Sequence, residues 1–240
     1  MRSPLANESQ IQGFLFVDKP VGLTSFDVVK KVRWLTKTKQ VGHAGTLDPF
    51  ASGLLILALG RQFTKQIYKF QDAAKTYAVK MVLGIQTDTL DAYGKIEKYD
   101  QVKTNQLSYE SIDSTLHQFV GEQAQIPPMF SAKKVNGQRL YHLARQGIQI
   151  EIEPKNVVIH DVCLDQVDFY QFPIIQFTTR CSKGTYVRSL VRDIGEKMHS
   201  VAYTKDLVRT HIDHYDVKDA IAFSDLTREL IVEKISRVSP

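Results

Sequence analysis

The chain has 240 residues, a formal net charge of +5 and a pI near 9.0. This length suffices for one large α/β domain or two modest ones, and either buries on the order of 70% of its unfolded surface. Two cysteines, Cys163 and Cys181, are too few for a disulfide framework or a zinc cluster, which favours a reducing cytoplasm. The sequence has neither a signal peptide nor a run of ~20 apolar residues, so we expect a soluble protein that stays inside the cell.

Helical and strand periods alternate through the first half of the chain. Thr24, with Asp27 three residues later, predicts a capping box that opens a helix. We expect Phe26, Val29, Val32 and Leu35 on the inner side of this helix. The other predicted elements are a strand at 14–17, a buried strand at 54–59, a short helix at 63–70 and an alternating strand at 77–83.

The second half continues this alternation, but less regularly. Pro127-Pro128 ends any preceding helix, and Asn136-Gly137 indicates a tight turn. The predicted elements are helices at 108–120 and 138–146, strands at 148–152, 157–167 and 173–180, a helix from about Thr185 and a helix at 224–235. Strands from every part of the chain imply one mixed sheet with helices packed against it, and we expect a single domain over residues 1–240.

One carboxylate, Asp48, lies in the most informative stretch, Gly42-His43-Ala44-Gly45-Thr46-Leu47-Asp48-Pro49-Phe50-Ala51-Ser52-Gly53-Leu54-Leu55. Glycines let the backbone turn where side chains would clash, and Pro49 biases Asp48 away from helical geometry. Asp48 is therefore expected on a shaped turn ahead of a buried strand, as a reactive group on a rigid support. The alternative is that Asp48 caps a short helix with Pro49 at its first position, which an Asp-Pro pair taken alone favours.

Basic residues gather in two segments, at Lys30, Lys31, Arg33, Lys37 and Lys39, and at Lys133, Lys134, Arg139 and Arg145. Solvated helix faces explain either cluster by itself. Because the two clusters flank the Asp48 stretch and neither has a broad apolar face, they favour a nucleic acid over a membrane as partner.

A lone carboxylate argues against a paired-carboxylate glycosidase but can act as a nucleophile if it is kept ionised. Arg188, in the first turn of the helix from Thr185, is the best candidate for holding it, although spacing alone fits a surface arginine better. Tyr77 and Tyr186 are either core residues or stacking platforms for a base. Cys181 is expected to be a buried small hydrophobe, and Asp88 and Asp91 to lie in a polar turn.

The run Gly42-His43-Ala44-Gly45-Thr46-Leu47-Asp48-Pro49, followed by Gly53-Leu54-Leu55, closely resembles the signature of bacterial tRNA pseudouridine-55 synthases, the TruB family. Four further segments agree in order. They are Asp18-Lys19-Pro20 with Thr24-Ser25, Lys75-Thr76-Tyr77, the stretch 127–145, and Cys181-Ser182-Lys183-Gly184-Thr185-Tyr186-Val187-Arg188. Together the five motifs span most of residues 14–210.

The resemblance implies isomerisation of a uridine in the TΨC loop of tRNA to pseudouridine, after base flipping, with neither metal nor organic cofactor. Asp48 would be the nucleophile, Arg188 would pair with it, and Tyr186 would assist proton transfer at C5. His43 would fill the space of the flipped base, Tyr77 would stack on that base, and Leu207 and Lys19 would contribute to the substrate site. The basic loop and helix at about 125–147, with Lys133, Lys134, Arg139 and Arg145, would clamp the RNA.

The implied fold is the α+β pseudouridine synthase fold, a mixed, mostly antiparallel sheet flanked by helices and loops. Many bacterial relatives continue into a C-terminal PUA domain, which is expected to be missing or vestigial here. The implied partner is tRNA alone, bound by a cytoplasmic monomer without an obligatory protein partner. Two alternatives remain: the catalytic subunit of a guide-RNA particle, and a non-catalytic module that binds or folds RNA.

Overall fold

The computed structural model describes residues 11–135, 137–148 and 150–236. The described chain divides into two compact units. Unit 1 comprises the chain up to Ala73 and again from Arg209, and unit 2 comprises Ala74–Val208. Whether the whole chain folds as one domain, as the sequence predicts, stays a prediction.

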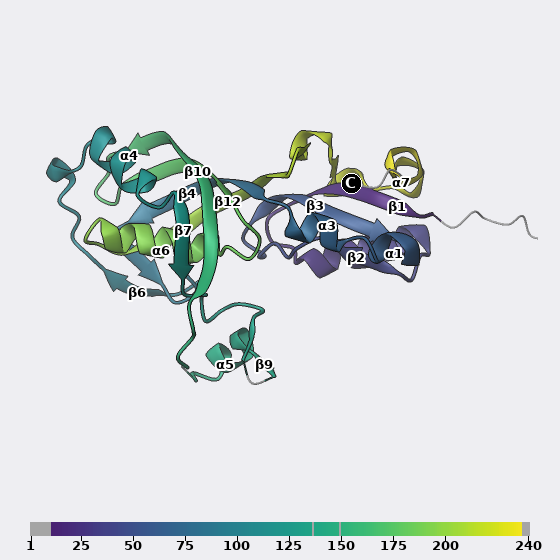
Figure 1. Cartoon of the computed structure of the whole chain (residues 1–240), viewed down its shortest axis with the longest axis horizontal. Coiled ribbons are helices and arrows are strands. Elements are labelled where there is room, and N and C mark those ends of the chain that lie inside the picture. Colours follow the sequence, from purple (N-terminus) through teal and green to yellow (C-terminus); the bar gives the residue numbers. More distant parts are fainter. Residues whose placement is uncertain (1–10, 136, 149, 237–240) are drawn as a thin grey trace, which may run out of the picture. The chain divides into compact units, whose positions relative to one another are not determined.

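Unit 1 is built on a small sheet whose strands come from both ends of the chain (Figure 1). Its elements are β1 (Gly13–Lys19), α1 (Ser25–Thr36), β2 (Val41–His43), β3 (Ser52–Leu59), α2 (Arg61–Thr64), α3 (Tyr68–Asp72), the end of β12 (Ala202–Ile212), β13 (Tyr215–Asp216), the 3₁₀ turns η2 (Val217–Asp219) and η3 (Phe223–Asp225), β14 (Ile221–Ala222) and α7 (Arg228–Lys234). β1 pairs antiparallel with β3 and parallel with β14, so the sheet is mixed.

β3 is the central strand of unit 1 and is buried on both faces. Leu55, Leu57 and Leu59 pack with α1 and α7 in one apolar cluster. Leu54, Ile56 and Ala58 point the other way into a second cluster with Phe63 and Phe70, which α2 and α3 supply. Because successive side chains of a strand alternate between faces, burial on both faces requires the continuous apolar run that the sequence shows.

Unit 2 contains a larger antiparallel arrangement, with β11 between β4 and β10, and β7 beyond β10. Its elements are β4 (Lys75–Leu83), β5 (Ile85–Thr87), β6 (Ile96–Tyr99), η1 (Thr104–Gln106), α4 (Tyr109–His117), β7 (Gly121–Gln125), β8 (Lys134–Val135), β9 (Gln138–Arg139), α5 (Leu140–Arg145), β10 (Lys155–Asp168), β11 (Ile174–Cys181), α6 (Val187–Lys197) and the start of β12.

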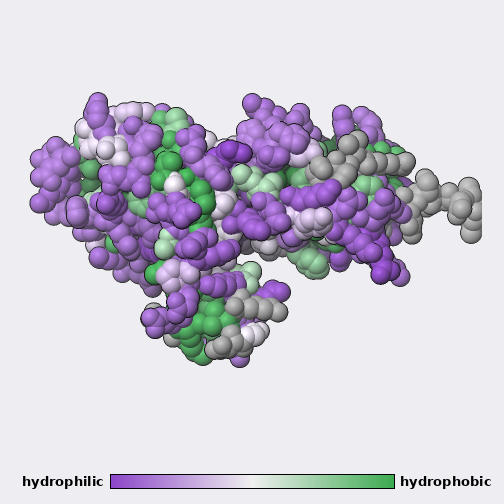
Figure 2. Space-filling model, viewed as in Figure 1, coloured by the Kyte–Doolittle hydropathy of each residue, from purple (hydrophilic) through white to green (hydrophobic). Residues whose placement is uncertain are grey.

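Helix α4 covers part of unit 2's sheet, because it packs against β10, and it also packs against α6. Ile112 and Leu116 of α4, and Leu190, Val191 and Ile194 of α6, are buried there. The hairpin β8–β9 and helix α5 lie beyond the ends of β7 and β10 (Figure 1). The surface over α5 carries hydrophobic residues beside hydrophilic ones (Figure 2).

Most predicted elements are confirmed, including the capping box of Thr24 and Asp27. Phe26 is a correction, because it is 50% exposed and lies beneath the cationic groups of Lys30 and Arg33 instead of facing the core. The helix predicted at 63–70 is two short helices separated by a turn. The prediction of a strand at 148–152 is wrong for the residues that the structure describes, because 148 and 150–152 form no strand. Gln149 lies outside the described residues, as do residues 1–10 and Asn136 of the predicted tight turn.

Candidate functional site

Asp48 lies in the turn that leads into β3. The Ala51 amide donates to the Asp48 carbonyl at 3.1 Å, and β3 begins at Ser52. No helix follows Pro49, so the alternative of Asp48 as a helix cap is wrong. Gly45 has φ +90° and Gly53 has φ +105°, where an L side chain is strained. The two glycines therefore give the backbone the sharp bends that bring Asp48 to the end of the strand.

Neighbouring groups of unit 1 hold this turn by its backbone. The Ser25 hydroxyl both accepts from the Leu47 amide at 2.9 Å and donates to the Leu47 carbonyl at 3.2 Å. The Gly22 amide donates to the Pro49 carbonyl at 2.7 Å. The residues on both sides of Asp48 are thus fixed from the loop that follows β1 and from the start of α1.

Two buried cations bind the ends of the same turn. Lys19 is fully buried and donates to the carbonyls of Ala51, at 2.6 Å, Leu23, at 2.8 Å, and Pro20, at 2.9 Å. Arg209, at 1% exposure, donates from Nε to the Leu54 carbonyl at 2.7 Å, and its second terminal nitrogen lies 3.3 Å from the Gly45 carbonyl. Because hydrogen bonds from charged donors are strong in a dry interior, this arrangement restricts how far the carboxylate can move.

Burial and the nearby Asp48 and Arg209 charges set the protonation of Lys19. Burial lowers its pKa to about 8, with Asp48 opposing and Arg209 reinforcing the decrease. The electrostatic influence of Asp48 places this carboxylate near the Lys19 ammonium. The sequence predicts that Lys19 binds substrate. Its hydrogen bonds to Ala51, Leu23 and Pro20 go to backbone carbonyls of the turn and its approach, and a substrate contact stays a prediction.

His43 ends β2, opposite Leu57 of β3. Its ring is partly buried, and burial lowers the pKa below the ordinary value, opposed by the Gly45 backbone and reinforced by Arg209. The imidazole is therefore neutral near pH 7. A neutral, flat ring close to the turn suits contact with a nucleobase better than contact with a phosphate.

Arg188 lies in the first turn of α6 in unit 2, as predicted, but it is 4% exposed and is not the surface arginine that spacing favoured. Its guanidinium lies 3.4 Å from the Asp91 carboxylate and donates to the carbonyls of Thr89, at 2.7 Å, and Phe130, at 2.9 Å. Asp91 also accepts from the Thr89 hydroxyl at 2.8 Å. The predicted pairing of Arg188 with Asp48, which belongs to unit 1, stays a prediction.

The remaining predicted site residues of unit 2 lie on three of its elements. Tyr77 is partly buried on β4 opposite Thr179 of β11, and Leu207 is 7% exposed on β12. Tyr186 is the N-cap residue of α6, and its amide donates to the buried Gln125 side chain at 2.8 Å. Since Gln125 ends β7, this hydrogen bond ties the start of α6 to the segment that leads into the basic loop.

The basic segment at 133–145 is anchored at its base, and its two arginines are exposed. The Tyr141 amide donates to the Ser131 carbonyl at 3.1 Å, and Leu140 is fully buried. Arg139 and Arg145 are exposed, and both guanidinium carbons lie within 6 Å of the Tyr141 ring, at 5.9 and 5.7 Å. Lys133 donates to the Glu153 carbonyl at 3.3 Å. The arginines thus surround an aromatic ring at the surface, a combination suited to RNA.

Sequence reasoning missed three residues of this arrangement: Ser25, Arg209 and the buried Asp91. Arg209 follows Leu207 by two residues, so strand periodicity puts both side chains on one face, and this signal points Arg209 inward. Ser25 and Asp91 carry no comparable signal, because a helix-start serine and an aspartate in a polar turn are ordinarily solvated.

Comparison with solved structures identifies the fold. The chain is similar to one from a Cbf5–Nop10–Gar1 complex, with a TM-score of 0.70 and 23% identity over 95% of this chain and 60% of that one. It is also similar to a chain from an H/ACA RNP bound to a substrate RNA containing 2′-deoxyuridine, with a TM-score of 0.63 and 23% identity over 90% and 52% of the two chains. Identities this low show the fold alone, which is the expected α+β fold of pseudouridine synthases.

Sequence comparison then identifies the family. The pattern of the TruB family pseudouridylate synthases, N-terminal domain, matches residues 33–187. The chain is 42% identical to tRNA pseudouridine synthase B of Clostridium acetobutylicum over 95% of this chain and 76% of the relative, and 41% identical to that of Desulfotalea psychrophila over 90% and 88%. The chain belongs to the TruB family of pseudouridylate synthases.

Proposed function

We propose that this chain isomerises uridine to pseudouridine at position 55, in the TΨC loop of tRNA, with Asp48 as the nucleophile. Its relatives from Clostridium and Desulfotalea are tRNA pseudouridine synthases, and they match at least 90% of the chain. The observation that carries the assignment of Asp48 is the way its turn is held, by Ser25, Lys19 and Arg209. A carboxylate on a fixed backbone is positioned for attack before the substrate arrives.

The reaction exchanges one glycosidic bond for another. Asp48 attacks the flipped nucleoside, the bond from N1 of the uracil to C1′ of the ribose breaks, and the uracil rotates in the pocket. A bond then forms from C5 to C1′, and the bond to Asp48 breaks, which regenerates the carboxylate. C5 gives its proton to solvent and N1 takes up a proton, so the product is an isomer of the substrate and the reaction needs no oxidant or reductant.

Other residues position the substrate in this proposal. His43, neutral near pH 7, occupies the place of the extruded base, and Tyr77 stacks on the flipped ring. Tyr186 assists removal of the C5 proton, and Leu207 lines the pocket. Arg188 pairs with Asp48 and keeps it ionised, while Lys19 acts through the backbone of the turn.

The segment from 125 to 147 closes on the RNA, with Lys133, Lys134, Arg139 and Arg145 contacting phosphates. Its anchors at Gln125 and Ser131 support a clamp with a fixed base. The protein works on tRNA in the cytoplasm as a monomer, without a guide RNA or a protein partner. None of the described helices is long and apolar enough to cross a membrane.

Tritium release from a TΨC stem-loop labelled at C5 of uridine tests this function. We expect release by the purified wild type without added guide RNA or protein, and none by Asp48→Asn. Asp113→Asn, which removes a partly exposed carboxylate of α4, is the matched control and should release tritium like the wild type. An Asp48→Asn variant as active as the control would show that the nucleophile is wrong, and an inactive wild type would refute the proposed activity.

A further inference from the structure

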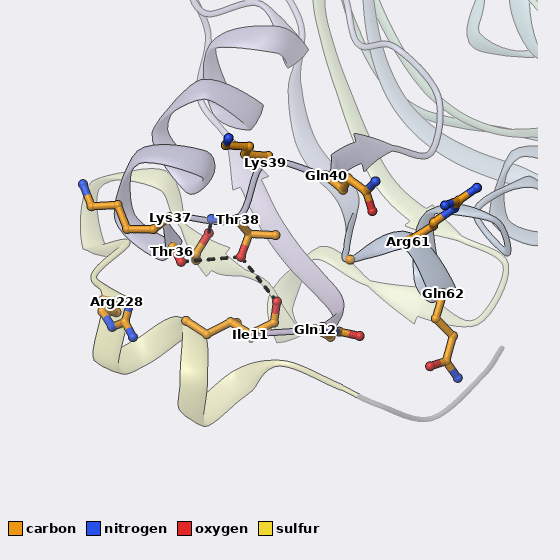
Figure 3. Close-up of a pocket in the computed structure, with 11 residues that line it drawn as sticks. Ile11, Gln12, Thr36, Lys37, Thr38, Lys39, Gln40, Arg61, Gln62 and Arg228 are labelled. Atoms are coloured by element: carbon orange, nitrogen blue, oxygen red, sulfur yellow. Dashed lines mark hydrogen bonds between the residues drawn. The ribbon is translucent and has the colours of Figure 1, made fainter. Parts of the chain in front are cut away.

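A basic groove of about 660 Å³ lies in unit 1 (Figure 3), and no residue of the Asp48 turn lines it. Its walls come from the segment before β1, the end of α1 with the residues that follow it, the start of α2, and α7. The lining residues are Ile11, Gln12, Thr36, Lys37, Thr38, Lys39, Gln40, Gly60, Arg61, Gln62 and Arg228. Four of them are cations and none is an aspartate or glutamate, so the groove attracts anions.

Three of the four cations of the groove are not paired with carboxylates of the described residues. Lys37, Lys39 and Arg61 are exposed and form no ion pair with any residue in the described ranges. Gln40 and Gln62 also line the groove, as does Thr38, whose hydroxyl lies 3.4 Å from the carbonyl oxygens of Ile11 and Thr36 (Figure 3). Arginine, lysine, glutamine and threonine side chains are those that contact phosphate and sugar in nucleic-acid complexes.

An exposed indole adjoins the groove. Trp34, the single tryptophan of the chain, is 69% exposed on α1, and the Lys37 ammonium lies 5.3 Å from the centre of its ring. Because Lys37 also lines the groove, cation and aromatic ring form one surface. Single-stranded nucleic acid binds to this combination through its phosphates and by base stacking.

The groove lies too far from Asp48 to hold the target nucleotide. Gln40 and Gly60 line it at the end of β3, where the Gly60 amide donates to the Gln40 carbonyl at 2.8 Å. The Asp48 turn precedes the other end of this strand, which spans Ser52–Leu59. Seven residue steps of about 3.3 Å separate the two ends by about 23 Å.

We propose that this groove is a second RNA-binding site, which holds the phosphodiester backbone of the substrate tRNA outside its TΨC stem-loop, with an unpaired base stacked on Trp34. The inference rests on tRNA being the substrate. It assigns Lys37, Lys39, Arg61 and Arg228 to phosphate contacts and separates recognition of the whole tRNA from recognition of the target loop. An isolated stem-loop leaves the groove empty.

The test compares Lys39→Gln/Arg61→Gln with the wild type in binding unmodified full-length tRNA and the isolated stem-loop over a salt series. Each lost phosphate contact reduces the slope of log K against log salt by about 0.7–0.9, so two contacts remove about 1.4–1.8. Between about 50 and 200 mM salt, wild-type affinity for full-length tRNA should therefore fall about tenfold more than that of the variant. Stem-loop affinity and turnover should match the wild type.

Lys98→Gln/Lys218→Gln removes the same charge from exposed positions outside the groove and should bind full-length tRNA like the wild type. Trp34 emission should be quenched by full-length tRNA and not by the stem-loop. A groove variant with wild-type affinity and salt slope for full-length tRNA would overturn the proposal, as would equal weakening by the control pair. Pseudouridine formation by the wild type is measured separately, so failure of the catalytic assignment is distinguishable from failure of the groove.

Discussion

Arg209→Met tests whether the buried guanidinium holds the Asp48 turn. Methionine keeps much of the side-chain length and fills the cavity, but it removes the hydrogen bonds to the Leu54 and Gly45 carbonyls, at 2.7 and 3.3 Å. Each hydrogen bond from a charged donor contributes about 1.5–3 kcal/mol, and the longer contact belongs at the low end. We therefore expect the free energy of unfolding to fall by about 3–4 kcal/mol, a large share of the total for a natural protein.

The same change should reduce catalysis more than binding. Because Arg209 is buried and acts on the backbone of the turn, its loss should leave KM for the stem-loop near the wild-type value. We expect kcat to fall at least about tenfold, which corresponds to an increase of about 1.4 kcal/mol in activation free energy. Urea unfolding and single-turnover tritium release measure the two effects at a temperature where the variant is folded.

Arg33→Met is the matched control for this experiment. Arg33 also donates to one backbone carbonyl of unit 1, that of Val41, at 2.9 Å, but β2 meets the opposite end of β3 there. Its loss should cost stability without lowering kcat. The reasoning would be refuted if the free energy of unfolding of Arg209→Met lay within about 1 kcal/mol of the wild-type value, since an average substitution has an effect of that size. It would also be refuted if Arg209→Met and Arg33→Met lowered kcat equally.

Three further outcomes are expected. Gly53→Ala should lower both the free energy of unfolding and kcat, because Gly53 has φ +105° and the added Cβ would overlap the Arg209 backbone. Urea unfolding and the tritium assay measure the two effects, and a variant as stable as the wild type would contradict the prediction. As pH rises from about 8 to 10.5, the free energy of unfolding of the wild type should increase relative to that of Lys19→Met. The reason is that the pKa of Lys19 is lowered to about 8 in the folded protein, so the unfolded chain binds more protons in that window. Unfolding at several pH values measures the difference between the two proteins, and a difference that does not change with pH would contradict the prediction. Burial raises the pKa of Cys181 to about 11, so a thiol reagent at pH 8 should label the exposed Cys163 quickly and Cys181 only in unfolded protein; two fast-reacting thiols would refute this.

Local patterns in the sequence were enough to predict most elements of the fold. The apolar run 54–59 predicts a strand buried on both faces, and β3 is one, because a strand exposed on either face would carry polar residues at alternate positions. The capping box of Thr24 predicts the start of α1 for an equally local reason. Alternation alone is not sufficient, because the described residues of 148–152 alternate but form no strand, and a strand also needs a partner to pair with.

The candidate site also has a part that the local sequence predicts and a part that it does not. The glycines and the proline around Asp48 predict its turn from the sequence, because backbone conformation depends on adjacent residues. Burial of Arg188 was not predictable, because its carboxylate partner Asp91 is 97 positions away and comes from a turn that is expected to be solvated.

The sequence by itself determined the family, the element order and the turn that presents Asp48. Only the tertiary structure decided which groups hold this turn and where the basic residues gather. Arg209 reaches Leu54 across 155 positions, and the groove unites residues from Ile11 to Arg228. The physical reason is that a periodic pattern reports which side of an element is buried, whereas the partner of a buried charge depends on how distant segments pack.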